Sequence, residues 1–397
     1  MLINIIIFYF FCQLLKLKFY NLYFIFSKYN YYKFIIIGFK NMIIQINKII
    51  LRFSIISIFF ISCKYTADSK KEIKNMYPHL AKYIDKVYSM SEKERKGLLL
   101  MVGIKDKILS EETIKILKEN KIAGIILFDY NIENETQLKK LTSDLREYVN
   151  PNMLIAVDEE GGKVNRIHFD KLKNISPKNI GDKNDKEYVY KIAYQKSKFL
   201  LDLGINMILG PICDIPKDSN SYLYDRSFST NINIVADMVE ATVKAQRDAG
   251  IITVLKHFPG HGDTAVNSHD DFPIIDKKIS ELKNKEFVPF KRGIDAGAEM
   301  ILTAHIKNKY IDDKLPVSLS KNYITILEKD MNFSGVIITD DLTMTGKIEK
   351  GINFGINLNS DIYQNIEYMF EDMKPDIISC AKVLKVISEN DYLARKK

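Results

Sequence analysis

The stretch 255–273, which reads LKHFPGHGDTAVNSHDDFP, gathers many side chains that could do chemistry. It follows an apolar run directly, and its candidates for acid–base work or binding are Lys256, His257, His261 and His269. An imidazole titrates near neutral pH, so it can donate and accept a proton under ordinary conditions. Zinc is the other use that several histidines suggest, but neither HExxH nor paired cysteines accompany them. We therefore expect acid–base chemistry here, without a metal or other cofactor.

Polar side chains also stand directly after other short apolar runs, where buried strands are expected to end. These residues are Asp158, Asp214 (just beyond Gly210-Pro211), His305 and Asp340. The carboxyl ends of the strands of a (β/α) barrel share one rim, so residues far apart in the sequence meet there in one pocket. We therefore expect these residues and the stretch 255–273 to form a single site.

The elements that must position these residues alternate regularly from residue 75 onward. We expect strands at 123–128, 153–157, 206–209, 251–255, 299–303 and 336–339, and helices at 110–119, 135–148, 186–203, 233–249, 281–296 and 319–331. This alternation predicts an α/β fold with a parallel sheet, and the number of units favours a (β/α)8 TIM-type barrel. An open doubly wound sheet is disfavoured because no GxGxxG loop follows the first strand.

The C-terminal end of the expected barrel is irregular. A helix is expected at 361–373, the apolar segment 376–380 (DIISC) is predicted as the eighth strand, and a closing helix is expected at 381–388. We take 75–397 as one catalytic barrel domain.

Five motifs together resemble the bacterial β-N-acetylglucosaminidases of glycoside hydrolase family 3, in their lipoprotein form. The motifs are DEEGG (158–162), DRSF (225–228), KHFPGHGDT (256–264), TAHI (303–306) and TDDLTM (339–344). The resemblance implies a retaining glycoside hydrolase that removes β-linked N-acetylglucosamine from cell-wall-type, peptidoglycan-derived amino sugars. Such an enzyme needs one group that attacks the sugar carbon and one that protonates the leaving oxygen.

The resemblance also implies a role for each matched residue. Asp340 would be the nucleophile and His269 the acid/base. Substrate would be bound by Asp158, Arg226, Lys256 and His257, with support from Asn267, Asp214 and His305. His261 lies in a Pro-Gly-His-Gly turn, where we expect a structural hydrogen bond, and His305 is expected either to line the site or to pack in the core.

Asn267 departs from the family pattern, which has an aspartate two residues before the acid/base histidine. A neutral amide can orient the imidazole but cannot stabilise its charged form as a carboxylate does. Two alternatives to the hydrolase therefore stay open. The chain could be a catalytically impaired sugar-binding lipoprotein, or an N-acetylglucosaminide phosphorylase that uses the same site, since a histidine acid/base places no second anion against phosphate.

The positive charge of the chain is concentrated at its N-terminus. The formal net charge is +8, and residues 1–62 contain seven cations and no acid, which leaves 51 basic and 50 acidic residues for the remainder. A nearly neutral body gives no reason to expect a nucleic-acid partner. The chain has four cysteines, and two of them, Cys213 and Cys380, lie beyond residue 63. These two are expected to be buried and unpaired.

The first 62 residues are expected to be a leader. Residues 1–41 are low in complexity and are either an extended membrane-directed leader or sequence upstream of a start at Met42; we favour the second. From Met42 to residue 62 the chain resembles a lipoprotein signal, with a positive region and an apolar segment too short to span a bilayer. Lipidation at Cys63, a polar tether over 63–74 and export to the cell envelope are predicted, with the lipid as the only membrane contact.

Overall fold

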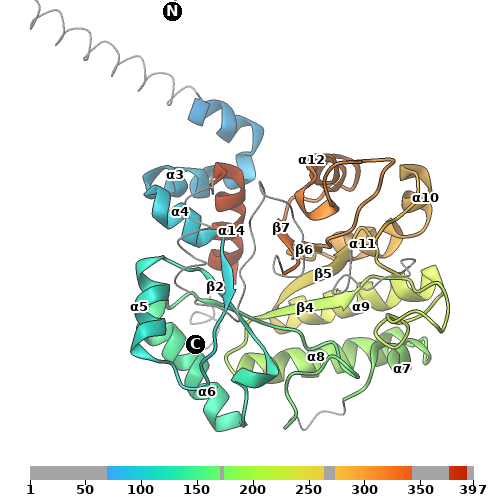
Figure 1. Ribbon diagram of the computed structural model, residues 1–397, viewed down its shortest axis with the longest axis horizontal. Helices are drawn as coiled ribbons and strands as arrows, with labels where there is room; N and C mark the ends of the chain where they lie inside the picture. Colours follow the sequence, from blue (N-terminus) through green and yellow to red (C-terminus); the bar gives the residue numbers. More distant parts are fainter. Residues whose placement is uncertain (1–68, 170–173, 263–272, 342–374, 391–397) are drawn as a thin grey trace, which may run out of the picture. The chain divides into compact units, whose positions relative to one another are not determined.

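Figure 1 shows the computed structural model of the chain, which describes residues 69–169, 174–262, 273–341 and 375–390. Contacts divide the chain into one unit that ends at Met76 and one that begins at Tyr77. Residues 69–76 are helical, and the fold described below belongs to the second unit. The predicted leader and Cys63 lie outside the described residues. Among the described helices, none is both long and apolar enough to cross a bilayer.

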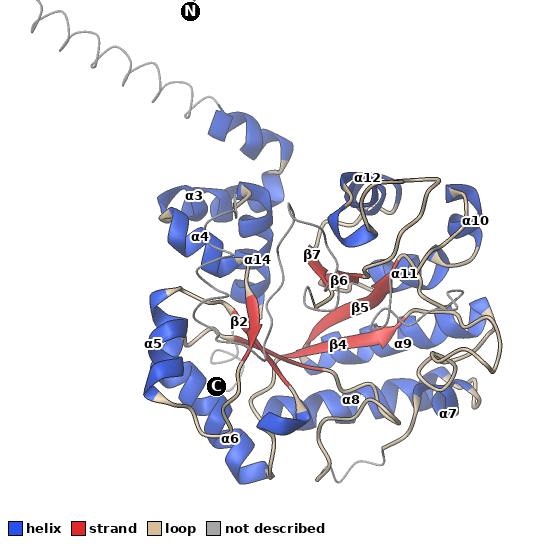
Figure 2. Ribbon diagram, in the orientation of Figure 1, coloured by secondary structure: helices blue, strands red, loops and turns tan. Residues whose placement is uncertain are grey.

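Seven parallel strands form one curled sheet, and their order in the sheet is their order in the chain (Figure 2). The strands are β1 (Met101–Gly103), β2 (Gly124–Leu127), β3 (Leu154–Val157), β4 (Met207–Ile212), β5 (Ile252–Phe258), β6 (Met300–Thr303) and β7 (Val336–Thr339). A parallel sheet in sequential order requires a crossover between each pair of strands, and each of these crossovers contains at least one α-helix. The predicted α/β class is therefore confirmed, whereas within the described ranges the sheet has seven strands with β1 and β7 at its edges.

The helices that accompany the sheet match the predicted alternation. They are α3 (Ala81–Ser89), α4 (Glu92–Leu98), α5 (Glu111–Glu119), α6 (Glu135–Asp144), α7 (Pro177–Gly181), α8 (Lys186–Asp202), α9 (Ile232–Ala249), α10 (Ile279–Asn284), α11 (Phe287–Asp295), α12 (Lys321–Thr325) and α14 (Ile377–Glu389). The end of α9 shows how the sequence sets up the strand that follows. Gly250 has a φ of 92°, which a glycine adopts without a steric cost, and it turns the chain directly into β5.

The prediction of an eighth strand at 376–380 is wrong, because these residues begin α14. The Asp376 carboxylate accepts a hydrogen bond of 2.7 Å from the main-chain N–H of Ser379 and so caps the helix. Cys380, Ala381 and Leu384 are buried with the spacing of a helical face. The helix packs against α3 and α4 and contacts β7. The helix predicted at 361–373 lies outside the described residues.

Three predicted helices are divided in the structure. The helix expected over 135–148 is α6 followed by a π-helical turn at Leu145–Val149. The helix expected over 281–296 is broken between α10 and α11, since Pro289 has no N–H to donate to the turn before it. The helix expected over 319–331 is a short α12 followed by a π-helical turn at Ile326–Asp330.

Strands β4 and β5 run further than the sequence predicts. β4 continues through Gly210-Pro211 to Ile212, because a register shift between Leu209 and Gly210 accommodates a proline that has no N–H for the ladder. β5 includes Lys256 and His257, which are both buried. These two side chains therefore rest on a strand and not on a loop.

Candidate active site

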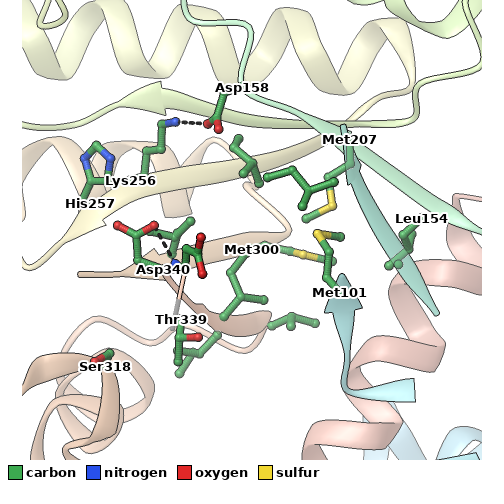
Figure 3. A pocket seen from close by; sticks show the side chains of 18 of the residues that line it. Met101, Leu154, Asp158, Met207, Lys256, His257, Met300, Ser318, Thr339 and Asp340 are labelled. Carbon is green, nitrogen blue, oxygen red and sulfur yellow. Dashed lines mark hydrogen bonds and ion pairs between the residues drawn. The ribbon is translucent and has the colours of Figure 1, made fainter. Parts of the chain in front are cut away.

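A cavity of about 670 Å³ extends along the inner face of the sheet, from residues that begin the strands to residues beyond their carboxyl ends, where a barrel is expected to carry its site (Figure 3). Its floor is apolar and includes Met101, Met207 and Met300. Its polar lining includes Asp158, Glu160, Arg166, Tyr222, Arg226, Lys256, His257, His261, Asp340 and Asp341. The lining thus combines cations, carboxylates and imidazoles, which suits a polar ligand such as a sugar.

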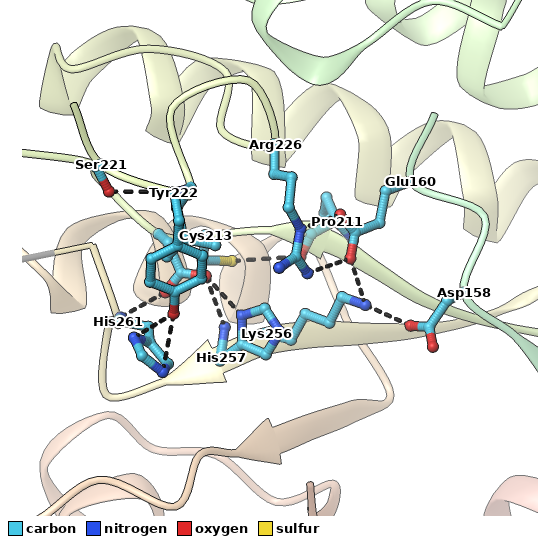
Figure 4. A network of polar contacts seen from close by, with 12 residues as sticks. Asp158, Glu160, Pro211, Cys213, Ser221, Tyr222, Arg226, Lys256, His257 and His261 are labelled. Atoms are coloured by element: carbon cyan, nitrogen blue, oxygen red, sulfur yellow. Dashed lines mark hydrogen bonds and ion pairs between the residues drawn. The ribbon is translucent and has the colours of Figure 1, made fainter. Parts of the chain in front are cut away.

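Lys256 and Arg226 are held by a pair of carboxylates just beyond β3 (Figure 4). The Lys256 ammonium lies 2.5 Å from Asp158 Oδ1 and 2.7 Å from Glu160 Oε1. Arg226 donates two hydrogen bonds of 2.8 Å to the two oxygens of Glu160. This bidentate contact is among the strongest that an arginine makes.

Burial and charge act in opposite directions in this network. Burial alone would raise the pKa of Glu160, but Lys256 and Arg226 outweigh it and lower that pKa to about 2. Burial likewise disfavours the charge on Lys256, yet Asp158 and Glu160 raise its pKa. Glu160 and Lys256 are therefore both charged at neutral pH, although both side chains are almost completely buried.

Asp214 links His257, at the end of β5, to His261 in the turn that follows. Figure 4 shows the two histidines. One carboxylate oxygen lies 2.7 Å from His257 Nδ1, and the other accepts a hydrogen bond of 2.6 Å from the main-chain N–H of His261. Burial would raise the pKa of Asp214, but His257 and His261 lower it. The His261 ring lies 2.7 Å from the Tyr222 hydroxyl, and burial lowers its pKa to about 4, so it is neutral at neutral pH.

Asp340 follows β7 and lies across the cavity from Lys256 (Figure 3). Its main-chain N–H donates a hydrogen bond of 2.9 Å to the carbonyl of Thr303 in β6, and its Oδ1 accepts one of 2.9 Å from the N–H of Asp341. His305 supports the same segment, because its Nε2 lies 3.1 Å from the carbonyl of Asp341 and its Nδ1 lies 2.7 Å from the Ser318 hydroxyl. The rigid end of β7 therefore fixes where the Asp340 carboxylate stands.

The structure brings most of the predicted site residues together. The cavity is lined by Asp158, Arg226, Lys256, His257 and Asp340. Asp214 and His305 are buried behind the lining and contact it. Asn267 and His269 lie outside the described residues, and so their roles stay predictions. No cluster of side chains suited to a metal ion occurs within the described part of the chain.

Glu160, the carboxylate that binds both buried cations, was not among the site residues predicted from the sequence. A signal for it was present, because Glu160 stands two residues after Asp158 in DEEGG. In an extended chain, residues i and i+2 point to the same side. Two acids on one side of the strand end could have been matched to the two cations of the predicted site.

Comparison with known proteins agrees with this geometry. Residues 91–356 match the family described as "Glycosyl hydrolase family 3 N terminal domain". The beta-hexosaminidase of Actinobacillus pleuropneumoniae serotype 5b is 32% identical over 276 residues, which are 66% of this chain and 79% of that protein.

Solved structures show the same relationship. A glycoside hydrolase family 3 beta-N-acetylglucosaminidase from Paenibacillus sp. str. FPU-7 superposes with a TM-score of 0.70 at 26% identity, covering 77% of this chain and 63% of that one. NagZ from Neisseria gonorrhoeae in complex with N-trifluoroacetyl-D-glucosamine superposes with a TM-score of 0.64 at 27% identity, covering 75% and 94%. The family predicted from the five motifs is thereby confirmed: the chain belongs to glycoside hydrolase family 3 and is a glycosidase.

Proposed function

We propose that the chain is a retaining β-N-acetylglucosaminidase that acts on cell-wall-type amino sugars. The observation that carries the proposal is the placement of Asp340 across one cavity from the Lys256–Asp158 pair. The relatives named beta-hexosaminidase and the similar structure with a bound N-acylated glucosamine support an amino sugar as the substrate.

Lys256 and Asp158 offer complementary contacts to neighbouring sugar hydroxyls. An ammonium group has three N–H donors, and two of those of Lys256 are used by Asp158 and Glu160, which leaves one for a ligand. The second oxygen of Asp158 is 3.9 Å from Arg166, too far for a hydrogen bond, and can accept one from a hydroxyl. The pair would thus hold the sugar through one donor and one acceptor.

In the proposed reaction, the Asp340 carboxylate attacks the anomeric carbon while the bond to the leaving oxygen breaks. His269 gives its proton to that oxygen, and the sugar remains as an ester on Asp340. His269 then removes a proton from a water molecule, which attacks the same carbon and releases both the sugar and Asp340. Two displacements at one carbon retain the configuration.

The test is release of the aryl group from a nitrophenyl β-N-acetylglucosaminide. Asp340→Asn is expected to lower kcat by on the order of 10⁴-fold, and Asp295→Asn, at the exposed end of α11, serves as the matched control with unchanged kcat. A fluorinated substrate analogue should trap the ester, and the labelled peptide should contain Asp340. Full activity of Asp340→Asn, or a label on another residue, would contradict the assignment.

The same assay separates the alternatives. N-Acetylglucosamine 1-phosphate, formed when phosphate is supplied, would identify a phosphorylase. Binding of N-acetylglucosamine without turnover would identify a sugar-binding protein. We also propose, from the signal-like segment that ends at Ser62, that Cys63 carries lipid and anchors the enzyme to the cell envelope.

A further inference from the structure

Asp214 satisfies three hydrogen-bond donors with a single buried carboxylate. Its Oδ2 accepts from the main-chain N–H of His257 at 3.3 Å and lies 2.7 Å from Nδ1 of the same residue, while Oδ1 accepts from the N–H of His261 at 2.6 Å. The side chain of Asp214 is fully buried. A main-chain N–H can only donate, so both oxygens must act as acceptors.

This arrangement fixes where His257 carries its proton. Burial would raise the pKa of Asp214, but the two histidines lower it, so the carboxylate is ionised and has no proton to donate. Nδ1 of His257 must therefore be the donor in the 2.7 Å contact. The ring lines the cavity, and among the described residues no protein group bonds to its Nε2. In the neutral ring, Nε2 is then a hydrogen-bond acceptor.

We propose that Asp214 is a positioning residue, which holds the proton of His257 on Nδ1 and so presents Nε2 to the bound sugar as an acceptor. The identity of the ligand rests on the proposed function. Lys256, the preceding residue, presents a donor. A hydroxyl is both donor and acceptor, so a sugar hydroxyl can bond to His257 and Lys256 at once. A fluorine or methoxy group at that position can accept but not donate, and it would be discriminated against.

Asp214→Asn is the informative substitution, because it keeps the shape of the side chain and changes one acceptor into a donor. The amide oxygen can serve the N–H of His261 only if the NH2 group faces His257. Nδ1 must then accept a hydrogen bond, which moves the ring proton to Nε2. The group that faces the sugar thereby changes from an acceptor to a donor. An Asp→Asn change beside a histidine is known to trap the wrong tautomer in this way.

The direct measurement is nitrogen NMR of protein labelled with ¹⁵N-histidine, at a pH at which the His257 ring is neutral. The chain has six histidines, and the signals of His257 are identified by their loss in His257→Gln. The parent protein should show a protonated Nδ1 and a bare Nε2, and Asp214→Asn should exchange the two. Asp312→Asn is the matched control, because Asp312 also accepts two main-chain N–H groups and one further donor but does not line the cavity.

Kinetics provide the second measurement. Asp214→Asn should raise KM by about tenfold or more with a much smaller fall in kcat, since a hydrogen bond to the sugar is lost in the ground and transition states alike. The substitution should add nothing to KM in a His257→Gln background, whereas a merely structural role would add there too.

Two results would overturn the inference: a proton on Nε2 of His257 in the parent protein, or an unchanged tautomer and KM in Asp214→Asn. If the parent protein turns over no substrate, the proposed function fails. In that case the tautomer and the dissociation constant of N-acetylglucosamine still decide the role of Asp214.

Discussion

Glu160→Gln tests whether the buried cations of the site depend on this one carboxylate. Glu160 is 1% exposed and makes three contacts of 2.7–2.8 Å to Lys256 and Arg226. Its pKa lies at about 2, against an ordinary value of 4.5. That displacement corresponds to about 3 kcal/mol of stabilisation, at 1.36 kcal/mol per pH unit. Removing one partner of a buried ion pair typically costs about 3–5 kcal/mol, which is of the same size.

The loss of stability in Glu160→Gln should depend on pH. Because the folded-state pKa is below the ordinary value, the ionised carboxylate stabilises the fold fully above about pH 4.5. Its contribution disappears as the pH falls toward 2. Glu160→Gln should therefore lower the free energy of unfolding by about 3–5 kcal/mol at pH 7, and the difference from the parent protein should shrink in acid.

Urea unfolding followed by far-ultraviolet circular dichroism measures this difference, since the chain has no tryptophan. Glu240→Gln is the matched control. Hydrogen bonds from Lys244 and Arg292 lower the pKa of Glu240 to about 2 as well, but these groups lie at the surface of α9 and α11. The free energy of unfolding of Glu240→Gln should fall by less than about 1 kcal/mol. Equal losses in both variants, or a pH-independent loss in Glu160→Gln, would refute the argument from burial.

Two further predictions concern segments outside the described residues. Asn267→Asp should raise kcat by about tenfold or more, because a carboxylate stabilises the charged form of His269; an unchanged rate on the aryl substrate would remove Asn267 as a limit on catalysis. Cys63→Ala should abolish incorporation of labelled palmitate and move the protein from the membrane fraction to the soluble fraction. Labelling that persists in this variant would contradict the lipid anchor.

The sequence predicted those parts of the fold that depend on local patterns. The positions of β2 to β7 followed from short apolar runs, whereas β1, with three residues, was not predicted. Site residues such as Asp158 and Asp340 followed from their place directly after a strand. The strand prediction at 376–380 was wrong because a segment of five residues, four of them apolar or small, fits a strand and a helix equally well. The helix is favoured by Asp376, whose side chain caps it, and by the buried face that continues to Leu384.

Contacts between residues far apart in the sequence could not be predicted from such local patterns. Lys256 meets Asp158 across 98 positions, and Arg226 meets Glu160 across 66. Each residue could be matched to a motif, but which carboxylate neutralises which cation depends on the curl of the sheet. The same holds for Asp214, whose role is set by its burial against the turn at His261.

The two carboxylates of DEEGG differ in the oxygens that they leave for a ligand. Glu160 uses both of its oxygens on Lys256 and Arg226 and has no exposed acceptor for a ligand. Asp158 is 18% exposed and uses one oxygen on Lys256. If Glu160 were absent, Asp158 would be the only carboxylate close to Lys256, and a hydroxyl would compete with that ammonium for it. With Glu160 neutralising the buried cations, Asp158 keeps an oxygen directed at the cavity, where it can accept a hydrogen bond from the substrate.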